Sequence, residues 1–375
     1  MRSSDGGPLM RRLDWSAMIL RRLVRRALPV AAVLSAAVAA PAAAEHPKAL
    51  LAHTPSGGQP NAPATDPAIS KDGRMDRYAA YSSAATDIVS GSGGHRNVFL
   101  VKRAGRITRT GTPWQMGATT LVSKGIGGPA NGDSWSPAFD GYDYVHAGRE
   151  ITVAPSCLAF VSAASNLVRG DANGHADVFL KRLRGGLKRI GTPAAASEVA
   201  LDGRCRFMAY VAGGSVYLKD LRHGGVKRIS AAGGASSPEL SANGKVTVYS
   251  QNGSVFVNRQ GGGGTHRIAA GSATTGDEWG RYVAFQSGTD IWLANTQGAP
   301  NAHVIASGGA APSMTAGGHF VFYVAGSVAT SNVYKSFGTC PGGSAAQQIA
   351  GSPHGNYAAF SCSNGALFLS YIGAK

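Results

Sequence analysis

A short apolar run that ends in an aromatic residue recurs seven times along this 375-residue chain, and a second such run follows each copy. The aromatic residues of the first set are Tyr81, Phe160, Tyr210, Tyr249, Phe285, Tyr323 and Phe360. Those of the second set are Phe99, Phe179, Tyr217, Phe256, Trp292, Tyr334 and Phe368. From Tyr210 onward the first aromatic residue recurs every 36 to 39 residues. A period of about forty residues with several short strands in each unit is typical of a repeat architecture, and of a β-propeller in particular.

The composition agrees with an all-β fold. The chain has 52 glycines, 15% charged residues and 43% apolar residues, a balance that suits many short strands joined by tight turns and excludes a disordered chain. After residue 45 the sequence shows no long amphipathic helical pattern. We therefore expect one closed propeller over residues 45–375, and we expect it to be a monomer.

Each unit can be divided into four strands. The innermost strand follows a Ser-Pro turn, as at Ser136-Pro137, and a glycine-bearing turn such as residues 201–204 leads into the aromatic-ended second strand. The third strand carries the second aromatic residue; in the sixth unit we place it at residues 333–335. The fourth strand recurs six times, at residues 120–123, 188–191, 227–230, 266–269, 303–306 and 347–350.

The count of strands indicates how the ring closes. Seven copies of the second and third strands accompany only six of the fourth, and residues 48–52 offer a matching strand ahead of the first unit. We therefore predict seven four-stranded blades, the last completed by the N-terminal strand, since closure removes exposed sheet edges. The alternative is a six-bladed ring in which the last aromatic pair, Phe360 with Phe368, is an insertion.

The N-terminus has the pattern of a targeting segment. Paired arginines at residues 21–22 and 25–26 precede an apolar stretch over residues 27–40, and Ala42-Ala43-Ala44 supplies a small-residue cleavage pattern before Glu45. We predict a signal peptide and basic leader over residues 1–44. A signal anchor is the alternative, although the stretch is shorter than the ~20 apolar residues of a spanning helix. The mature chain is then secreted or periplasmic, in the cell envelope, without a transmembrane segment.

The charge balance indicates which partners the protein attracts. The formal net charge is +16, and removing residues 1–44 takes away seven arginines and two aspartates, which leaves +11. Such a surface attracts polyanions such as anionic wall polymers, lipid headgroups or nucleic acid. Alternatively, the basic residues of the fourth strands protect sheet edges from pairing. We expect a protein or an anionic envelope polymer as partner, and no specific nucleic acid.

Four cysteines suit an oxidising compartment. Cys157 and Cys205 fall near the start of equivalent strands in adjacent units, and Cys340 and Cys362 also fall in neighbouring units. Of the three possible full pairings we favour Cys157 with Cys205 and Cys340 with Cys362. The four cysteines lack the spacing of a metal site.

Loop lengths point to the first two blades as the binding region. The two aromatic residues of a unit are 18 and 19 residues apart in units one and two but seven apart in units three to five, and further insertions occupy residues 105–117 and 141–151. Because binding residues concentrate on loops, we expect a site on this rim. Its candidate residues are Trp114, Trp135, Asp143, His146 and His175. The tryptophans can alternatively pack between blades, and the histidines can be ordinary surface residues.

The second unit resembles the TolB-type β-propeller repeat family of exported bacterial proteins. The resemblance lies in residues 159–168 (AFVSAASNLV), 170–174 (GDANG) and 176–180 (ADVFL). It is strong over this stretch and weak over the rest of the mature chain. It implies a propeller fold and a role in binding proteins or envelope components, without implying one activity.

The loop of the second unit is also a candidate calcium site. Asp171, Asn173 and Asp177 place three oxygen-bearing side chains in a glycine-containing loop, and calcium takes six to eight oxygen ligands. The alternative is that these side chains bond their own backbone in a tight turn.

Common enzyme motifs are absent from the sequence: it has no Gly-x-Ser-x-Gly, no His-Glu-x-x-His and no phosphate loop. The leading hypothesis is therefore an exported, non-catalytic propeller that binds a protein or a surface polymer through blades one and two. A hydrolase or lyase acting on polysaccharide, with carboxylates among Asp140, Asp143 and Glu150, is the alternative. A structural propeller whose separate partner does the chemistry is the third. An enzyme should gather titratable side chains with perturbed pKa values in a water-accessible funnel.

Overall fold

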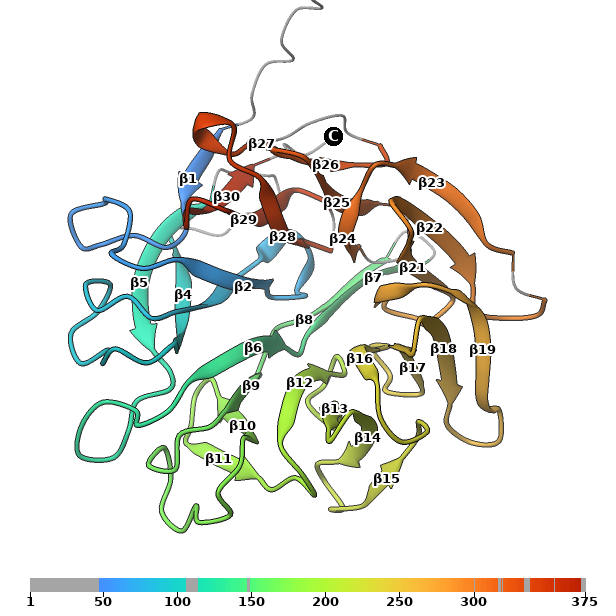
Figure 1. Cartoon of the computed structure of the whole chain (residues 1–375), viewed down its shortest axis with the longest axis horizontal. Coiled ribbons are helices and arrows are strands. Elements are labelled where there is room, and N and C mark those ends of the chain that lie inside the picture. The colour runs from blue at the N-terminus through green and yellow to red at the C-terminus, as the bar shows by residue number, and fades with distance from the viewer. Residues whose placement is uncertain are drawn as a thin grey trace, which may run out of the picture. The chain divides into compact units, whose positions relative to one another are not determined.

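The computed structural model is a ring of seven four-stranded antiparallel sheets around a central channel (Figure 1). It describes residues 47–105, 114–146, 149–299, 301–315, 318, 320–333, 338–353 and 355–371, all within one compact unit. These residues contain no α-helix, so the all-β, seven-bladed prediction is confirmed. The segment predicted as a signal peptide, residues 1–44, lies outside them. Across the described residues we find no helix with the length and apolar character needed to span a membrane.

The first three blades follow the chain in order, and only the second is interrupted. Blade 1 consists of β2 (Ala64–Ile69), β3 (Tyr78–Ser83), β4 (Asn97–Ala104) and β5 (Gln115–Leu121). Blade 2 consists of β6 (Ser134–Phe139), β9 (Cys157–Ser162), β10 (Asp177–Arg182) and β11 (Leu187–Ile190), with a separate hairpin of β7 (Tyr142–His146) and β8 (Arg149–Val153) between its first two strands. Blade 3 consists of β12 (Ala196–Leu201), β13 (Phe207–Ala212), β14 (Ser215–Asp220) and β15 (Val226–Arg228).

The remaining blades complete the ring. Blade 4 consists of β16 (Ala235–Leu240), β17 (Val246–Gln251), β18 (Ser254–Arg259) and β19 (Gly264–Ala270), and blade 5 of β20 (Ser272–Gly276), β21 (Tyr282–Ser287), β22 (Asp290–Asn295) and β23 (His303–Ser307). Blade 6 consists of β24 (Ala310–Met314), β25 (Val321–Ala325), β26 (Val328–Ser331) and β27 (Gly338–Thr339). Blade 7 consists of β28 (Ala346–Gly351), β29 (Tyr357–Cys362), β30 (Leu367–Tyr371) and, from the other end of the chain, β1 (Lys48–Leu50).

The recurring aromatic residues are cross-strand partners at the centre of the blades. In six blades the first aromatic residue lies directly opposite the second, as Tyr210 does opposite Tyr217. The ring centroids of these pairs are 5.4 to 6.5 Å apart. Such contacts add about 0.5–1.5 kcal/mol to the stabilisation that burial alone supplies. The sequence period therefore reports the packing of the blade interior.

Blade 6 is the exception, and two strand assignments there were wrong. Its third strand is β26, which places Thr330 rather than an aromatic residue opposite Tyr323. The predicted strand at residues 333–335 falls after β26, with Tyr334 outside the described residues. Residues 347–350 lie in β28, the innermost strand of blade 7, and not in a fourth strand. The aromatic signal failed because this blade pairs its second strand without a second ring.

The N-terminal strand closes the ring by pairing with the last one. In β1, Leu50 lies opposite Phe368 of β30, and the Leu51 amide donates to the Leu367 carbonyl at 2.8 Å. The Lys48 ammonium lies 5.5 Å from the centre of the Phe368 ring. The outer edge of β30 is thereby covered.

Every blade ends its innermost strand with a buried oxygen-bearing side chain that holds the next strand. These residues are Ser70, Asp140, Asp202, Ser241, Asp277, Thr315 and Ser352. Each accepts a hydrogen bond from a backbone N–H at or just before the start of the second strand. We call this end of the ring, where first and second strands join, the turn end. The opposite end, where second and third strands join, is the loop end.

The predicted Ser-Pro turns lie inside the innermost strands instead of before them. Ser136 and Ser237 have φ values of 53° and 50° and occupy β-bulges that Pro137 and Pro238 follow. A bulge bends its strand locally.

The favoured disulfide pairing is confirmed. Cys157 and Cys205 join blades 2 and 3, with Cα atoms 6.1 Å apart, and Cys340 and Cys362 join blades 6 and 7 at 5.7 Å. The described chain has no free cysteine. Two disulfides are typical of proteins in oxidising compartments.

Candidate functional site

The central channel is the best-formed cavity of the propeller. The innermost strands of all seven blades line it, and its volume is about 280 Å³. An ion pair between Lys71 of blade 1 and Glu239 of blade 4 crosses it. Because the two blades are not neighbours, this pair connects opposite sides of the ring.

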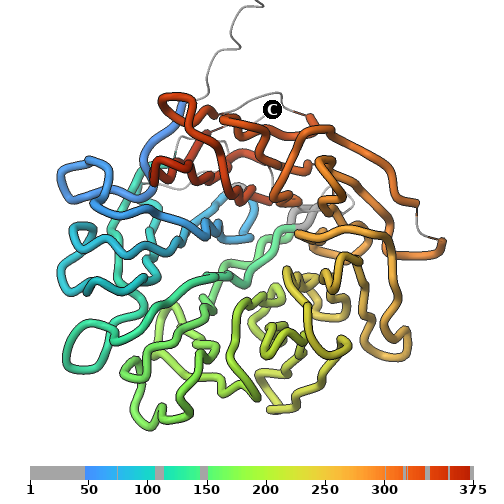
Figure 2. Tube along the Cα trace, viewed as in Figure 1, coloured from blue at the N-terminus to red at the C-terminus, as the bar shows by residue number. Residues whose placement is uncertain are grey.

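The β7–β8 hairpin lies at the turn end of this channel. Figures 1 and 2 show it running from blade 2 across the middle of the ring in projection. The Gly141 amide donates to the Gly203 carbonyl at 3.2 Å, and the Arg204 guanidinium donates to the Tyr142 hydroxyl at 2.6 Å. The same guanidinium lies 5.3 Å from the centre of the Tyr142 ring, and Tyr142 lines the channel. Blade 3 thus anchors the base of the hairpin.

The turn of blade 1 is also longer than the repeat requires. From blade 3 to blade 7, the buried turn residue and the start of the second strand are five positions apart, as in Asp277 and Tyr282. In blade 1, Ser70 and Tyr78 are eight positions apart, and in blade 2 the hairpin extends the distance further. The only long turns among the seven therefore belong to the first two blades.

These two irregular turns pack against each other. The short 3-10 helix η1 (Gly73–Met75) of blade 1 contacts β7. A Cβ atom at Gly73 would lie 2.5 Å from Cγ of Asp143, and Gly73 has a φ of +68°. Both the close approach and the backbone conformation demand glycine at this position. The Thr152 hydroxyl of β8 donates to Asp143 at 2.6 Å, which fixes the carboxylate from the hairpin side.

Two buried aspartates of the blade 1 turn have contrasting environments. Asp72 accepts hydrogen bonds from the Ser70 hydroxyl at 2.6 Å and from the Arg77 guanidinium at 2.5 Å. Asp76 is 1% exposed, and neither of its carboxylate oxygens has a hydrogen-bond partner. Asp76 also has left-handed backbone angles, with a φ of 37° and a ψ of 59°. It combines an uncompensated polar group with an uncommon backbone conformation.

The surroundings of Asp76 favour the protonated form of its carboxyl group. Burial raises its pKa well above the ordinary value of 3.8, and the negative charges of Asp72 and Asp143 add to this, while the charge of Arg103 and a polar contact with the Ser352 side chain act in the opposite direction. Arg103 donates to the Met75 carbonyl at 2.7 Å and to the Tyr357 hydroxyl at 3.1 Å. The guanidinium therefore braces the blade 1 turn against blade 7.

A second perturbed carboxyl group lines the channel from blade 5. Burial raises the pKa of Glu278 to about 8, a bond to Trp279 opposes this, and the negative charges of Asp143 and Asp277 raise it further. The irregular turns thus place acidic groups from blades 1, 2 and 5 close enough to influence one another. At neutral pH, Glu278 is therefore largely a neutral acid.

The sequence-predicted binding residues do not form one site. Asp143 lies in the acidic cluster at the turn end, and Trp114 lies beside it. His146 ends β7, and its side chain is outside the described part of the chain. Trp135 and His175 lie at the loop end. The expectation of a single rim was wrong because successive connections of an antiparallel blade alternate between its two ends, so the insertion at 141–151 and the long loops after Ser83 and Ser162 are on opposite faces.

Both tryptophans pack between blades. The indole N–H of Trp114 donates to the Asp76 carbonyl at 2.6 Å, and that of Trp135 donates to the Ser197 carbonyl of blade 3 at 2.8 Å. Their rings pack against the apolar clusters between neighbouring blades, and the Arg96 guanidinium lies 5.3 Å from the centre of the Trp135 ring. These contacts favour packing over sugar stacking.

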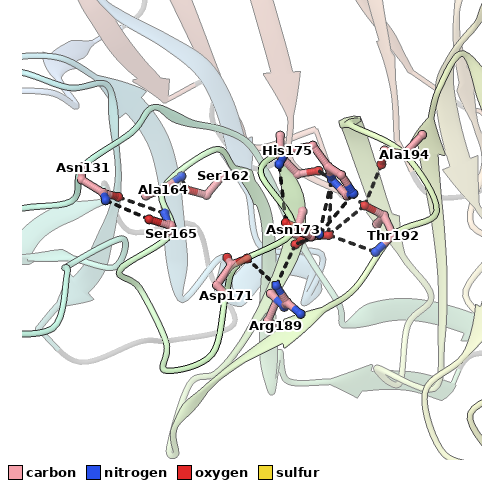
Figure 3. Close-up of polar contacts among 12 residues, drawn as sticks. Asn131, Ser162, Ala164, Ser165, Asp171, Asn173, His175, Arg189, Thr192 and Ala194 are labelled. Carbon is pink, nitrogen blue, oxygen red and sulfur yellow. Dashed lines mark hydrogen bonds and ion pairs between the residues drawn. The ribbon is translucent and has the colours of Figure 1, made fainter.

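The long loops at the loop end are held by a repeated asparagine contact (Figure 3). Asn131 accepts from the Ser165 amide at 2.9 Å and donates to the Ser165 hydroxyl at 2.9 Å. In blade 1, Asn61 makes the same two bonds to Thr86, at 3.0 and 2.9 Å. The extra length in these two loops therefore has an internal structural role.

The predicted calcium ligands already have protein partners (Figure 3). Arg189 pairs with Asp171 and lies 3.4 Å from a carboxylate oxygen of Asp177. The Asn173 side-chain amide donates to the Asp177 carboxylate at 2.8 Å. The backbone amide and the hydroxyl of Thr192 also donate to the Asp177 carboxylate, each at 2.9 Å. A guanidinium thus supplies the positive charge between the two carboxylates. Calcium at this loop stays an untested prediction.

Elsewhere in the described residues, the one group of three donors compact enough for a metal consists of Asp140, Cys157 and Cys205. Its two sulfur atoms form a disulfide, so it does not describe a metal centre.

Sequence reasoning missed Asp76, Arg103 and Glu278. A usable signal existed for the first: the three extra positions between Ser70 and Tyr78 break the five-residue spacing of the later turns. Arg103 lies within β4 and Glu278 follows the end of β20, and only their contacts with other blades reveal them.

We find no match to this chain among protein-family models, and no similar sequence among curated proteins. The resemblance to the TolB-type repeat family therefore depends on the residues of the second unit alone.

Proposed function

We propose that this protein is an exported, non-catalytic binding propeller that recognises a protein or a cell-envelope polymer through the turn end of blades 1 and 2. One observation carries the proposal. The turns of blades 3 to 7 share one spacing, whereas those of blades 1 and 2 depart from it and pack against each other beside the channel. Repeats stabilise a ring, and departures from the repeat are where a binding face can be built.

The environment of the acidic groups supports binding over catalysis. Asp72, Asp76 and Asp143 are each at most 1% exposed. A general acid or base must come within hydrogen-bond distance of a substrate, or reach it through one water. Asp143 packs between the hairpin and the blade 1 turn, and Asp72 and Asp76 are buried within that turn.

The test removes the hairpin and keeps the propeller. Replacing residues 141–155 with a three-residue turn restores the spacing of the later blades and leaves Asp140 and Ser156 in place. We expect this variant to lose the partner that the intact protein captures from envelope extracts. Asn131→Ala, which loosens the loop end, is the matched control and should retain the partner. Retention by the hairpin variant, with an unchanged melting temperature, would refute the proposed face.

A second candidate function is a hydrolase or lyase acting on polysaccharide, and Glu278 is the observation that favours it. A carboxyl group with a pKa of about 8 in a channel has the protonation state of a general acid at neutral pH. An enzyme of this kind should depolymerise an acidic polysaccharide, and Glu278→Gln should abolish that activity while leaving binding intact. Full-length polymer after prolonged incubation with the intact protein would count against catalysis.

A further inference from the structure

The positive charge of the propeller is concentrated in one part of the ring. Residues 177–270, which run from the third strand of blade 2 through blade 4, contain 14 Lys and Arg but five Asp and Glu. Residues 45–176 contain 12 and 10, and residues 271–375 contain three and three. Nearly all of the excess charge of the mature chain therefore belongs to two and a half consecutive blades.

The acidic residues of this stretch do not neutralise it at the surface. Asp177 and Asp202 are at most 2% exposed and are engaged by hydrogen bonds, and Glu198 accepts from the Ser237 amide at 2.6 Å. Glu239 pairs with Lys71 across the channel. Asp220 is the exception: it pairs with His223 at 2.9 Å, which lowers the pKa of this carboxyl group to about 2, and it keeps its negative charge.

Besides Arg204, which contacts the hairpin, we select six basic residues of this stretch at the turn end, where strands one and two or strands three and four of each blade join. We call them the basic arc: Arg184, Arg206, Arg222, Lys227, Lys245 and Arg259. Five of the six are exposed and Arg259 is half-buried. Among the described residues, the five exposed members have no salt bridge. Antiparallel register places them on one face, because Phe207 lies opposite Asp220 and Lys219 opposite Val226.

Two shallow grooves between blades cross this face. The first, about 590 Å³, lies between blades 3 and 4; its lining includes the cations Lys227 and Arg259, the carboxylate of Asp220, and Asn258 and Gln260, whose amides donate to Thr265 and to the Gly244 carbonyl. The second, about 630 Å³, lies between blades 4 and 5 and shares Arg259. Glycines 261, 262 and 264 form part of the first wall, which leaves backbone groups accessible. Cationic side chains thus lie along a path that continues from the first groove to the second through Arg259.

The chemistry of these grooves selects among anionic partners. A protein interface has an apolar centre, yet of the exposed large apolar side chains only Val226 lies in residues 177–270. Single-stranded nucleic acid needs open aromatic faces for base stacking, and the one Phe, Tyr or Trp of the two grooves, Phe207, has the Arg206 guanidinium 4.9 Å above its ring. Repeated cations instead suit carboxylates spaced along a chain.

We infer that the basic arc binds a linear acidic polysaccharide of the cell surface. The inference depends on the proposed binding function and adds the class of partner and a surface separate from the hairpin. The Arg204 guanidinium connects the two regions, since it contacts Tyr142 of the hairpin from blade 3.

The experiment measures the binding of polygalacturonate to the purified protein by calorimetry, at low and at moderate salt. The test variant is Arg222→Glu/Lys227→Glu, and a milder form is Arg222→Gln/Lys227→Gln. The control is Lys124→Glu/Arg169→Glu, which makes the same charge change at exposed positions of the loop end. We expect about tenfold weaker binding for the double Glu variant, a smaller loss for the Gln form, and no comparable loss for the control. Binding should weaken with salt because exposed charges are screened.

Three outcomes would overturn the inference. The first is an equal loss of polygalacturonate binding in the control variant, which would indicate attraction by net charge alone. The others are tighter binding of single-stranded DNA than of polygalacturonate, and no binding of polygalacturonate at low salt. The hairpin variant, with residues 141–155 replaced, should bind polygalacturonate like the intact protein. Failure of polygalacturonate binding with hairpin-dependent capture retained would overturn this inference alone. If the hairpin variant and the double Glu variant both still capture the partner, the proposed function is overturned.

Discussion

Blades 3 to 5 and blades 1 and 2 solve the same structural problem with different turns. In blade 5, Asp277 is buried, and it accepts hydrogen bonds from the amides of Arg281 and Tyr282 at 2.5 and 2.8 Å. In blade 1, Ser70 does this work, and the extra residues bring in Asp76, whose carboxylate oxygens have no hydrogen-bond partner. A carboxylate at one turn satisfies the backbone, whereas a carboxyl group at the other is a cost to the fold.

This difference teaches how to separate structure from function in a repeat protein. Residues that recur at equivalent positions, such as Asp202 and Asp277, are explained by the blade. A buried group outside the repeat that costs stability calls for another explanation, and functional sites are where proteins retain such groups. The following predictions test that distinction, beginning with the largest expected effect.

The disulfide between blades 2 and 3 joins the irregular part of the ring to the regular part. Its cysteines are 48 residues apart, so replacing Cys157 and Cys205 with serine should lower the free energy of unfolding by about 4 kcal/mol on the loop-entropy estimate. Denaturant unfolding of the variant and of the intact protein measures the change. The pair at Cys340 and Cys362, 22 residues apart, should cost less when replaced, about 3 kcal/mol. A larger loss there would mean that blades 2 and 3 do not depend on their cross-link.

A repeat carboxylate should be the next most important. Asp277→Ala leaves two buried backbone N–H groups without an acceptor and should cost about 3 kcal/mol. Asp277→Asn keeps a carbonyl acceptor and should cost less. Thermal and denaturant unfolding of the two variants at pH 7 gives the comparison. Equal effects would show that the charge matters more than the hydrogen bonds.

Replacement of Asp76, the buried carboxyl group outside the repeat, should raise stability where replacement of Asp277 lowers it. Asp76→Asn removes an ionisable buried group, retains a side chain that tolerates left-handed backbone angles, and should raise stability by about 1 kcal/mol at pH 7. The sign follows from the raised pKa. Well below the ordinary pKa of 3.8 the folded and unfolded chains both hold the proton, and titration adds no difference. As the pH rises toward the raised pKa, only the unfolded chain ionises, so the intact protein loses stability relative to the variant.

Unfolding measured from pH 4 to pH 8 checks this dependence. Glu278→Gln should show the same trend between about pH 4.5 and about pH 8. A stability difference for Asp76→Asn that does not change with pH would show that the native carboxyl group titrates normally, and the contrast between the two kinds of turn would fail.

How much the sequence could predict follows the same division. The aromatic pairs, such as Tyr210 with Tyr217, recur at a fixed period because the blade interior repeats, so the fold, the blade number and the disulfides could be predicted from spacing. Counting fourth strands also indicated the role of Lys48–Leu50 in the last sheet. The third strand of blade 6 was predicted wrongly because Thr330, and not an aromatic residue, lies opposite Tyr323.

The candidate site was less predictable because it depends on contacts between blades. Loop length identified blades 1 and 2, but it gave no indication of which end of the ring each loop occupies, and so Asp143 and His175 were placed together. The pKa of Glu278 depends on burial and on Asp143, which is far from it in the sequence. The period and spacing of the aromatic residues predict the structure of a single blade. They do not predict a site whose residues come from different blades around the channel.

The smallest expected effect concerns the loop of blade 2, where the sequence predicted calcium. In the structure the positive charge between Asp171 and Asp177 comes from Arg189, so millimolar calcium or a chelator should leave the melting temperature of the intact protein unchanged. Arg189→Gln sharpens the test, because it removes the guanidinium while leaving the carboxylates and Asn173 in place. That variant should be less stable without calcium, and added calcium should restore part of the loss if the oxygen atoms can close around an ion. A calcium-dependent rise in the melting temperature of the intact protein would instead show that the ion displaces Arg189, and this loop would then be a metal site rather than a structural turn.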